Sequence, residues 1–361
     1  MNPKSKIPEP MKKPILLYLT TLALAALCGG AAAGQATAQS APDMSKYILT
    51  PKPADTPRIN GARVFGVRPG SEFLYTIAAT GIRPMTFSAE GLPKGLKLDP
   101  KTGRITGRVT APGEYTVHLK ATNALGSSER SLKIVVGSEI ALTPPMGWNS
   151  WNCWARDVTQ EQVLSSARAM VESGLADHGW SYINIDDGWQ GKRGGKDNAI
   201  QPNAKFPDMK GLTRAIHDMG LRVGIYSTPW IGTYAAHIGS YSDNPDGVNE
   251  WIKKGRHNEH YRYQKEGGNY WKDRTEVWHL GPYSFVEADV KQWGEWGIDY
   301  LKYDWNPLDY YHVKEMHDAL RTLDRDVVYS LSNSAPYGDA PQWMQYSNCW
   351  RTTGDIRDTW E

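Results

Sequence analysis

The chain has 361 residues, which is enough for two domains with a sizeable hydrophobic core. Its formal net charge is +2, with 41 Lys and Arg against 39 Asp and Glu, so the composition excludes a strong electrostatic attraction to nucleic acid or to an acidic surface. A disulfide-stabilised scaffold is also excluded, because the whole chain holds three cysteines.

The first 38 residues have the pattern of a secretory signal peptide. Lys12 and Lys13 give a basic start, and the apolar run 15–27 is too short to span a bilayer comfortably. Small residues follow, with 36–38 as the cleavage site. We therefore expect a secreted or periplasmic protein that has no membrane contact once the signal is removed. Cys28 offers lipidation as an alternative, which is disfavoured because Leu27 stands where a small residue is normally required.

Residues 39–58 are rich in Pro, Ala and polar residues and are interpreted as a linker. From 59 to 138 the apolar residues follow a period of two, as at Tyr115, Val117 and Leu119, and turn-forming residues separate the runs. This pattern predicts a small all-β sandwich, and the segment 91–107 resembles the immunoglobulin-like modules of exported bacterial enzymes. A spacer is the simplest function for such a module, and sugar binding is the alternative.

After residue 139, short apolar runs alternate with amphipathic stretches. Thr159 and Gln162 have the spacing of a capping box, and a helical stripe follows at Val163, Ala167, Met170 and Val171. Further strands are expected at 182–185, 221–226, 300–303 and 327–331, and further helices at 212–219, 286–296 and 313–323. This alternation predicts an α/β domain with a parallel sheet, either open or closed.

Carboxylates stand at the ends of three expected strands. Asp186 and Asp187 end one strand, Asp304 ends another, and Asp355 follows a third. In a (β/α)8 barrel the loops after the strands form the active face, so these side chains are expected to converge on one pocket. Structural alternatives stay open: the Asp186–Asp187 pair can cap the following turn, and Asp304 can form a salt bridge with Lys302.

Six short segments combine these strand ends with Trp, Tyr, Lys and Arg. They are PMGWNSW at 145–151, YINIDDGW at 182–189, FP at 206–207, GIYS at 224–227, YLKYD at 300–304 and WRTTGDI at 350–356. In this order they resemble glycoside hydrolase family 27, the α-galactosidase family. The resemblance implies a (β/α)8 TIM barrel and a retaining α-galactosidase that acts on oligo- or polysaccharides without a metal or cofactor.

The resemblance also implies roles for individual residues. Asp304 matches the family nucleophile and Asp355 the general acid/base. Sugar-binding positions are matched by Trp151, Asp186, Asp187, Tyr226, Lys302 and Arg351. A retaining mechanism needs two carboxyl groups about 5–5.5 Å apart, one ionised and one protonated. We expect Lys302 to keep the pKa of Asp304 low, and burial or nearby negative charge to keep Asp355 protonated. Asp358 is the nearest competitor for the acid role.

Two departures from the family loosen the substrate assignment. A stretch of about 229–283 is longer than the family needs and rich in Trp and Tyr, which suggests a lid or wall that shapes the leaving-group subsites. Ser332 and Ala335 fall where α-galactosidases select the substituent at sugar carbon 2, and small residues there accept an N-acetyl group. Activities of the α-N-acetylgalactosaminidase, β-L-arabinopyranosidase and isomalto-dextranase types therefore remain alternatives.

Residues 139–361 contain six predicted strand-plus-loop units, whereas a closed barrel needs eight. We therefore expect a barrel truncated at its C-terminal side. A non-catalytic carbohydrate-binding protein is the alternative of another class, disfavoured because a pure binder has no need of both Asp304 and Asp355. Cys153 and Cys349 can pair or stay free. His257 and His260 are interpreted as solvated loop residues and not as metal ligands.

Overall fold

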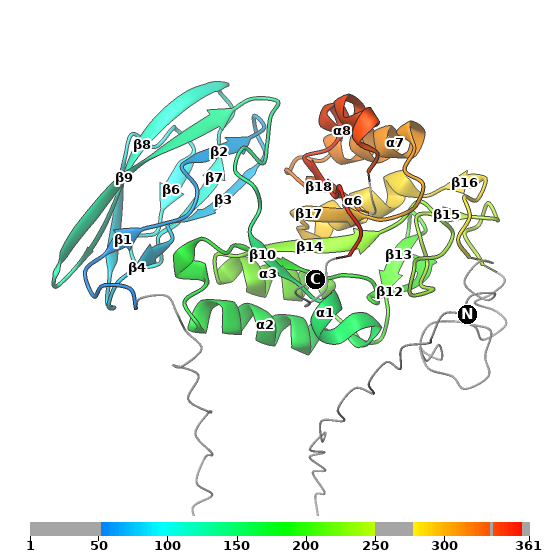
Figure 1. Cartoon of the computed structure of the whole chain (residues 1–361), viewed down its shortest axis with the longest axis horizontal. Helices are drawn as coiled ribbons and strands as arrows, with labels where there is room; N and C mark the ends of the chain where they lie inside the picture. The colour runs from blue at the N-terminus through cyan, green and yellow to red at the C-terminus, as the bar shows by residue number, and fades with distance from the viewer. Residues whose placement is uncertain (1–51, 250–276, 333–334, 356–361) are drawn as a thin grey trace, which may run out of the picture. The chain divides into compact units, whose positions relative to one another are not determined.

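The structure is a computed structural model that describes residues 52–249, 277–332 and 335–355. Residues 52–361 form one unit, in which a group of β-strands is followed by a sheet with helices (Figure 1). The unit holds two hydrophobic cores. One core lies inside an N-terminal β-sandwich. The other lies between a parallel sheet and the helices that cover it. The expected fold class, an immunoglobulin-like sandwich before an incomplete TIM barrel, is confirmed.

The sandwich is built from two main sheets, with alternate residues of their strands pointing inward. One sheet has the order β2 (Val64–Val67), β9 (Gly126–Val136), β8 (Gly113–Asn123) and β5 (Thr86–Glu90). The other has the order β3 (Glu72–Thr76), β7 (Arg104–Arg108) and β6 (Leu96–Leu98), and β1 (Arg58–Ile59) pairs with β4 (Ala79–Thr80). Val117 and Leu119 are almost fully buried, as the period-two pattern predicts, whereas Tyr115 is only partly buried.

The second core surrounds a six-stranded parallel sheet whose strands follow one another in chain order. They are β10 (Gly147–Asn149), β11 (Tyr182–Asn184), β14 (Arg222–Ser227), β17 (Tyr300–Tyr303), β18 (Val328–Leu331) and β19 (Cys349–Trp350). Every neighbouring pair is parallel. Sequential order with parallel pairing is the topology of a (β/α)8 barrel, so the sheet brings the ends of all six strands to one edge.

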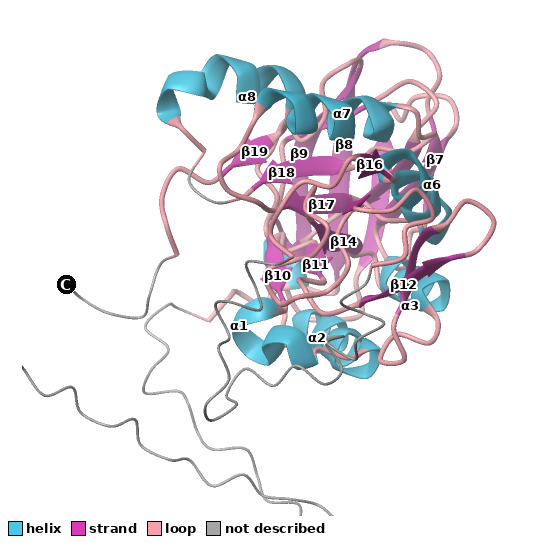
Figure 2. Cartoon of the chain, turned by 90° about the vertical axis from the view of Figure 1, so that its right-hand side faces the viewer, coloured by secondary structure: helices cyan, strands magenta, loops and turns pink. Residues whose placement is uncertain are grey.

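Helices connect these strands on the outer side of the sheet. They are α1 (Trp151–Trp154) and α2 (Gln160–Glu172), α3 (Met209–Asp218), α6 (Val286–Trp296), α7 (Tyr310–Arg321) and α8 (Ala340–Tyr346). Figure 2 shows β11, β14, β17 and β18 side by side, with α7 and α8 along one edge and α1 and α2 near the other. Short elements complete the connections: η2 (Ala155–Asp157), η3 (Ala176–His178), β12 (Gln190–Gly194), β13 (Ala199–Pro202), β15 (Tyr241–Ser242), β16 (Tyr283–Ser284) and η5 (Tyr337–Asp339).

Local signals set the helix boundaries. The capping box of α2 is present as predicted, because the Thr159 side chain accepts from the Gln162 backbone N–H and the Gln162 side chain accepts from the Thr159 N–H. The predicted stripe was wrong at Val171, which is 42% exposed. Eight residues after Val163, this position has rotated to the flank of the helix. Helix α7 begins three residues earlier than predicted because Asp309 caps it.

Two further observations concern the cysteines and the length of the helices. Cys153 and Cys349 are both free thiols. Within the residues that the structure describes, no helix is both long and apolar enough to cross a membrane.

Candidate active site

The sheet places the predicted polar residues at one edge, where its strands end. Asp304 directly follows β17, Ser332 directly follows β18, and Asp186 lies two residues beyond β11. Tyr226 pairs in register with Lys302 on the neighbouring strand. Since parallel strands end at the same edge, side chains that are far apart in the sequence meet here, as was expected.

Asp186 is fixed in place by four contacts at this edge. Its Oδ2 accepts hydrogen bonds from Lys302 Nζ at 2.8 Å and from Asn149 Nδ2 at 2.8 Å. Its backbone N–H donates to the Ser150 hydroxyl at 2.9 Å, and its Oδ1 accepts from the Asp187 N–H at 2.8 Å. The turn-capping alternative therefore holds in part, because one oxygen caps the local turn while the other forms a buried ion pair. The pKa of Lys302 is raised, since Asp186 and Asp304 outweigh the lowering effect of burial.

Asp304 is buried and held by a tyrosine. The Tyr226 hydroxyl donates to its Oδ2 at 2.9 Å, and 6% of the residue is exposed. Burial raises the pKa of Asp304, and the charge of Asp186 raises it further; Lys302 and the hydroxyls of Tyr226 and Ser332 lower it, with a net increase. The expectation of a lowered pKa was wrong, because burial outweighs a cation whose hydrogen bond goes to Asp186.

Asp187 is enclosed by a loop of the long insertion. Thr233 Oγ1 donates to its Oδ1 at 2.8 Å, and the Ala235 N–H donates to its Oδ2 at 2.7 Å. Only 1% of Asp187 is exposed. Burial raises its pKa to about 7, although these two hydrogen bonds lower it; the charges of Asp186 and Asp304 act in the same direction as burial.

This pKa predicts how stability depends on pH. Between the ordinary pKa of 3.8 and the raised value of about 7, the folded protein binds a proton at Asp187 that the unfolded chain does not. The stabilising contribution of this group is therefore fully present below the ordinary pKa and is lost as pH rises to about 7, which amounts to about 4 kcal/mol. Asp187→Asn removes the titration, so its melting temperature is expected to exceed the wild-type value by more at pH 8 than at pH 5.

Scanning calorimetry of the full-length protein at both pH values measures this difference. Asp197→Asn is the matched control, because Asp197 is an exposed carboxylate with a lowered pKa. If the difference in melting temperature between Asp187→Asn and wild type is the same at the two pH values, the raised pKa of Asp187 is contradicted.

The described part of the insertion is an aromatic wall beside Asp187. Trp230 stacks on Trp278 with ring centroids 5.7 Å apart, and Tyr234 packs against both rings at 5.1 and 4.9 Å. Trp278 Nε1 donates to the Thr233 carbonyl at 3.1 Å, which connects the aromatic rings to the residue that holds Asp187. Residues 250–276, which carry many of the other aromatic side chains of the insertion, lie outside the described residues.

The predicted acid/base lies in a different setting from the one expected. Asp355 is exposed, and its Oδ1 accepts from Arg351 Nη2 at 2.7 Å. Among the described residues, Arg351 is the only hydrogen-bonding partner of this carboxylate. The burial that was expected at Asp355 is not found in the described part of the chain. Asp355 lies five residues beyond β19, which among the described residues pairs only with β18.

The remaining predicted residues, Trp151, Ser332 and Ala335, also follow strands of the parallel sheet. Trp151 begins α1 directly after the motif residues Asn149 and Ser150, and its N–H donates to Asn149 Oδ1 at 2.9 Å. Ser332 and Ala335 are both buried. In the part of the chain that the structure describes, no group of three His, Cys, Asp or Glu side chains is arranged to hold a metal, and His257 and His260 lie outside that part.

Sequence reasoning missed three residues that position the carboxylates. Asn149 and Ser150 stand inside the quoted segment PMGWNSW and contact Asp186, but only Trp151 was assigned a role there. Thr233 contacts Asp187 from an insertion that carries no motif. A strand-end Asn-Ser pair was a usable signal for the first two, since short polar side chains at strand ends commonly orient neighbouring groups; nothing in the sequence singled out Thr233.

Comparison with known families and proteins agrees with the resemblance. Residues 143–254 match the family described as "Alpha galactosidase A", and residues 56–137 match the family described as "Putative Ig domain". Alpha-galactosidase A of Cellvibrio japonicus is 34% identical over 233 residues, which cover 62% of this chain and 46% of that protein. Alpha-galactosidase 3 of Arabidopsis thaliana is 30% identical over 269 residues, which cover 71% of this chain and 52% of that protein.

A solved structure resembles both parts of the chain. The crystal structure of a "putative alpha-galactosidase" from Bacteroides fragilis is 36% identical, with a TM-score of 0.71, and the match covers 87% of this chain and 60% of that one. Residues 139–361 alone are too few to supply this coverage, so the match includes the sandwich. The chain spans about half the length of the curated relatives it matches.

Proposed function

This chain is a relative of the α-galactosidases of glycoside hydrolase family 27 with an Ig-like module before its barrel, and from that premise we propose that the protein removes terminal α-linked galactose from oligo- or polysaccharides. One observation carries the proposal. A buried carboxylate, Asp304, is hydrogen-bonded by Tyr226 and stands beside the Lys302–Asp186 ion pair, at the edge of a parallel sheet where barrel enzymes keep their chemistry.

The proposed mechanism is a double displacement. Ionised Asp304 attacks the anomeric carbon, the glycosidic bond breaks, and the leaving oxygen takes the proton of Asp355. Water then attacks the same carbon, gives its proton to Asp355, and releases Asp304 from the glycosyl ester. Tyr226 fixes one oxygen of the nucleophile, and Asp186 and Asp187 accept hydrogen bonds from sugar hydroxyls. Catalysis requires Asp355 to lie about 5–5.5 Å from Asp304.

A second substrate is favoured by one observation. Ser332 directly follows β18, next to the strand that precedes Asp304, and Ala335 lies four residues beyond β18; both are small and buried. We propose that these small side chains leave room for an N-acetyl group at sugar carbon 2. Empty space discriminates weakly between substrates, whereas a polar group that loses its partner discriminates strongly, so an N-acetyl substrate is expected to be tolerated without being required.

The test is an assay of the full-length protein on aryl α-galactoside and on its N-acetyl analogue. We expect turnover of both, with values of kcat/KM within about 100-fold of each other, and NMR of the first-formed product is expected to show the α-anomer. Turnover of the N-acetyl analogue alone would make the protein an α-N-acetylgalactosaminidase. Sugar binding without turnover of any α-glycoside would instead identify a non-catalytic carbohydrate-binding protein.

We also propose that residues 1–38 direct export, on the pattern of basic, apolar and small residues. N-terminal sequencing of the exported protein tests this directly, with a new N-terminus near residue 39 as the expected result.

A further inference from the structure

The Ig-like module contacts the end of the barrel sheet that lies opposite the candidate active site. Its side chains donate to backbone carbonyls in the segments that precede three barrel strands. Asn60 Nδ2 reaches Asp177 before β11 at 2.9 Å, and Thr76 Oγ1 reaches Gly220 before β14 at 2.8 Å. Arg108 Nη1 reaches Asp324 before β18 at 2.9 Å. The candidate site residues Asp186, Tyr226 and Ser332 lie at or beyond the opposite ends of these three strands, so none of these contacts belongs to the sugar site.

Arg68 is the most heavily bonded residue of this interface. Its Nε donates to Asp326 Oδ1 at 2.6 Å, and its backbone N–H donates to the other carboxylate oxygen at 2.9 Å. The two guanidinium Nη atoms donate to the carbonyls of Arg321, Leu323 and Arg325 at and beyond the end of α7. A cation is favoured there, because the last carbonyls of a helix lack partners within the helix. The Arg68 side chain is 13% exposed and that of Asp326 15%, so the pair is largely shielded from solvent.

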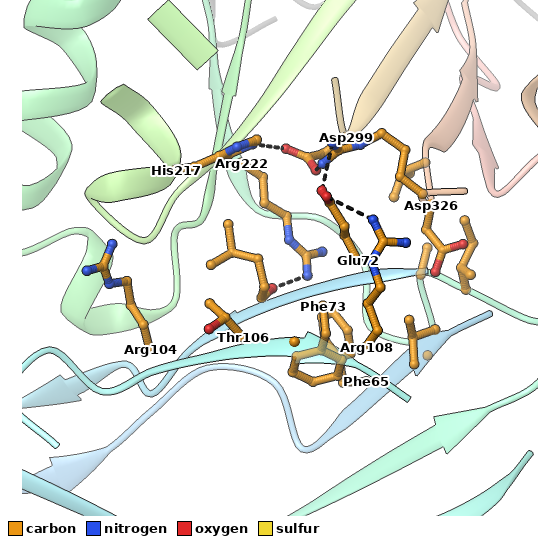
Figure 3. A pocket seen from close by; sticks show the side chains of 18 of the residues that line it. Phe65, Glu72, Phe73, Arg104, Thr106, Arg108, His217, Arg222, Asp299 and Asp326 are labelled. Atoms are coloured by element: carbon orange, nitrogen blue, oxygen red, sulfur yellow. Dashed lines mark hydrogen bonds and ion pairs between the residues drawn. The ribbon is translucent and has the colours of Figure 1, made fainter. Parts of the chain in front are cut away.

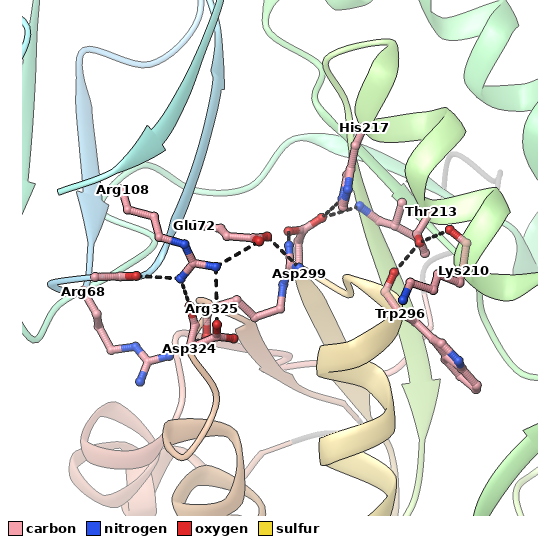
Figure 4. Close-up of polar contacts among 12 residues, drawn as sticks. Arg68, Glu72, Arg108, Lys210, Thr213, His217, Trp296, Asp299, Asp324 and Arg325 are labelled. Atoms are coloured by element: carbon pink, nitrogen blue, oxygen red, sulfur yellow. Dashed lines mark hydrogen bonds and ion pairs between the residues drawn. The ribbon is translucent and has the colours of Figure 1, made fainter. Parts of the chain in front are cut away.

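A second set of charges joins the module to the centre of the sheet (Figure 4). Asp299, just before β17, accepts from the Val223 N–H at 2.9 Å and contacts His217 Nε2 at 2.7 Å. Arg325 Nη2 donates to Asp299 at 2.9 Å, while Arg325 Nη1 pairs with Glu72 of the sandwich at 2.9 Å. Arg325 thus connects Glu72 of the sandwich to Asp299, whose carboxylate joins three segments of the barrel.

Between these contacts lies a cavity of about 420 Å³, seen from close by in Figure 3. Arg222, the first residue of β14, extends from the barrel toward the sandwich, stacks on Phe65 with its guanidinium carbon 4.6 Å from the ring centroid, and donates to the Leu74 carbonyl. The cations that line the cavity have partners of their own: Arg222 here, Arg108 and Arg325 as above. The cavity is therefore part of an interface held by charges, and we assign no ligand to it.

We propose that the Ig-like module is a structural base of the barrel and that the two parts unfold as one cooperative unit. The module holds together the segments before β11, β14 and β18 through the partly buried side chains of Asn60, Thr76 and Arg68. Breaking a buried, hydrogen-bonded ion pair is strongly destabilising, because the remaining charged group stays buried without its partner. This role differs from that of a spacer, whose unfolding leaves the barrel unaffected, and it does not depend on the proposed enzymatic function.

The distribution of tryptophan makes the proposal testable in the full-length protein. All 15 tryptophans of this chain lie at position 148 or later, so none reports on the sandwich. Arg68→Ala is expected to lower the midpoint of thermal unfolding followed by tryptophan fluorescence by roughly 5 °C or more. Val117→Ala, which opens a cavity in the sandwich core, a cluster of buried residues without tryptophan, is expected to lower the same midpoint. Lys120→Ala, which breaks an exposed pair within the sandwich, is the matched control and is expected to change it by about 1 °C or less.

Hydrogen exchange of the amides in β8 supplies the second readout, from the sandwich itself. Cooperative unfolding requires the tryptophan midpoint and the protection of β8 to fall together in both Arg68→Ala and Val117→Ala. Faster exchange in β8 with an unchanged tryptophan midpoint would overturn the proposal, and so would an Arg68→Ala protein as stable as wild type. If either variant does not fold, Arg68→Lys decides by the same two readouts, since lysine keeps the charge but loses the forked geometry.

Discussion

Replacing Asp304 by alanine in the full-length protein is expected to lower kcat on aryl α-galactoside by about 10⁴-fold or more. The loss is expected to be large because, in the proposed mechanism, Asp304 forms the covalent bond to the anomeric carbon. Binding of galactose is expected to persist, since Asp186, Lys302 and Tyr226 keep contacts that do not need Asp304. Steady-state kinetics and titration calorimetry with galactose measure the two quantities separately.

Azide gives this prediction a chemical signature. With Asp304 shortened, azide can enter on the side of the missing carboxylate and form the β-galactosyl azide, whose configuration is opposite to that of the substrate. Asp197→Ala is the matched control, because it removes an exposed carboxylate that pairs with Lys291, and it is expected to keep wild-type kcat. An Asp304→Ala protein with kcat within tenfold of wild type would refute the nucleophile assignment.

The parallel sheet could be predicted from the sequence because its signals are local. Strands at 300–303 and helices at 286–296 have the bounds predicted, and the ends of consecutive strands had to meet once the sheet was parallel. The family motifs then identified Asp186, Asp304 and Lys302, which the structure does bring together. Whether Asp355 joins them is a prediction that the described residues leave for experiment.

What sequence reasoning missed depends on contacts between distant segments. The clamp on Asp187 comes from Thr233, 46 residues away in the chain, in an insertion without a motif. The pKa of Asp304 was predicted in the wrong direction because spacing on one strand shows which side Lys302 faces but not how deeply the carboxylate is buried. The contacts of the sandwich with the barrel were also missed, because Arg68 and Asp326 are separated by 258 residues in the sequence.

The two ends of the barrel sheet therefore differ in how their carboxylates are paired. At the N-terminal ends of the strands, carboxylates such as Asp299 and Asp326 are paired with arginines, which favours stability. At the C-terminal ends, Asp186, Asp187 and Asp304 lie near one another, Lys302 bonds Asp186, and the pKa values of Asp187 and Asp304 rise. Such an arrangement costs stability and is typical of a site selected for chemistry. The paired charges at the N-terminal strand ends can therefore offset the destabilising effect of the crowded carboxylates at the C-terminal ends.

Replacing Asp355 by alanine is expected to give a loss that depends on the leaving group. A leaving group that needs a proton, such as the sugar alcohol of a natural oligosaccharide, is expected to lose about 10²–10⁴-fold in kcat/KM. A dinitrophenyl leaving group needs no proton, so formation of the glycosyl-enzyme is expected to proceed at close to the wild-type rate and the intermediate to accumulate. Pre-steady-state kinetics would then show a burst of dinitrophenol followed by slow turnover.

Azide again reports the stereochemistry, now with the opposite result. Since Asp304 still forms the glycosyl-enzyme, azide attacks that intermediate from the other side and yields the α-galactosyl azide, which restores turnover of the dinitrophenyl substrate. Asp358→Ala is the matched control, because Asp358 is the competing carboxylate three residues away. An equal loss on both leaving groups would show that Asp355 acts on binding or folding, and a burst in Asp358→Ala with normal kinetics in Asp355→Ala would transfer the acid/base role to Asp358.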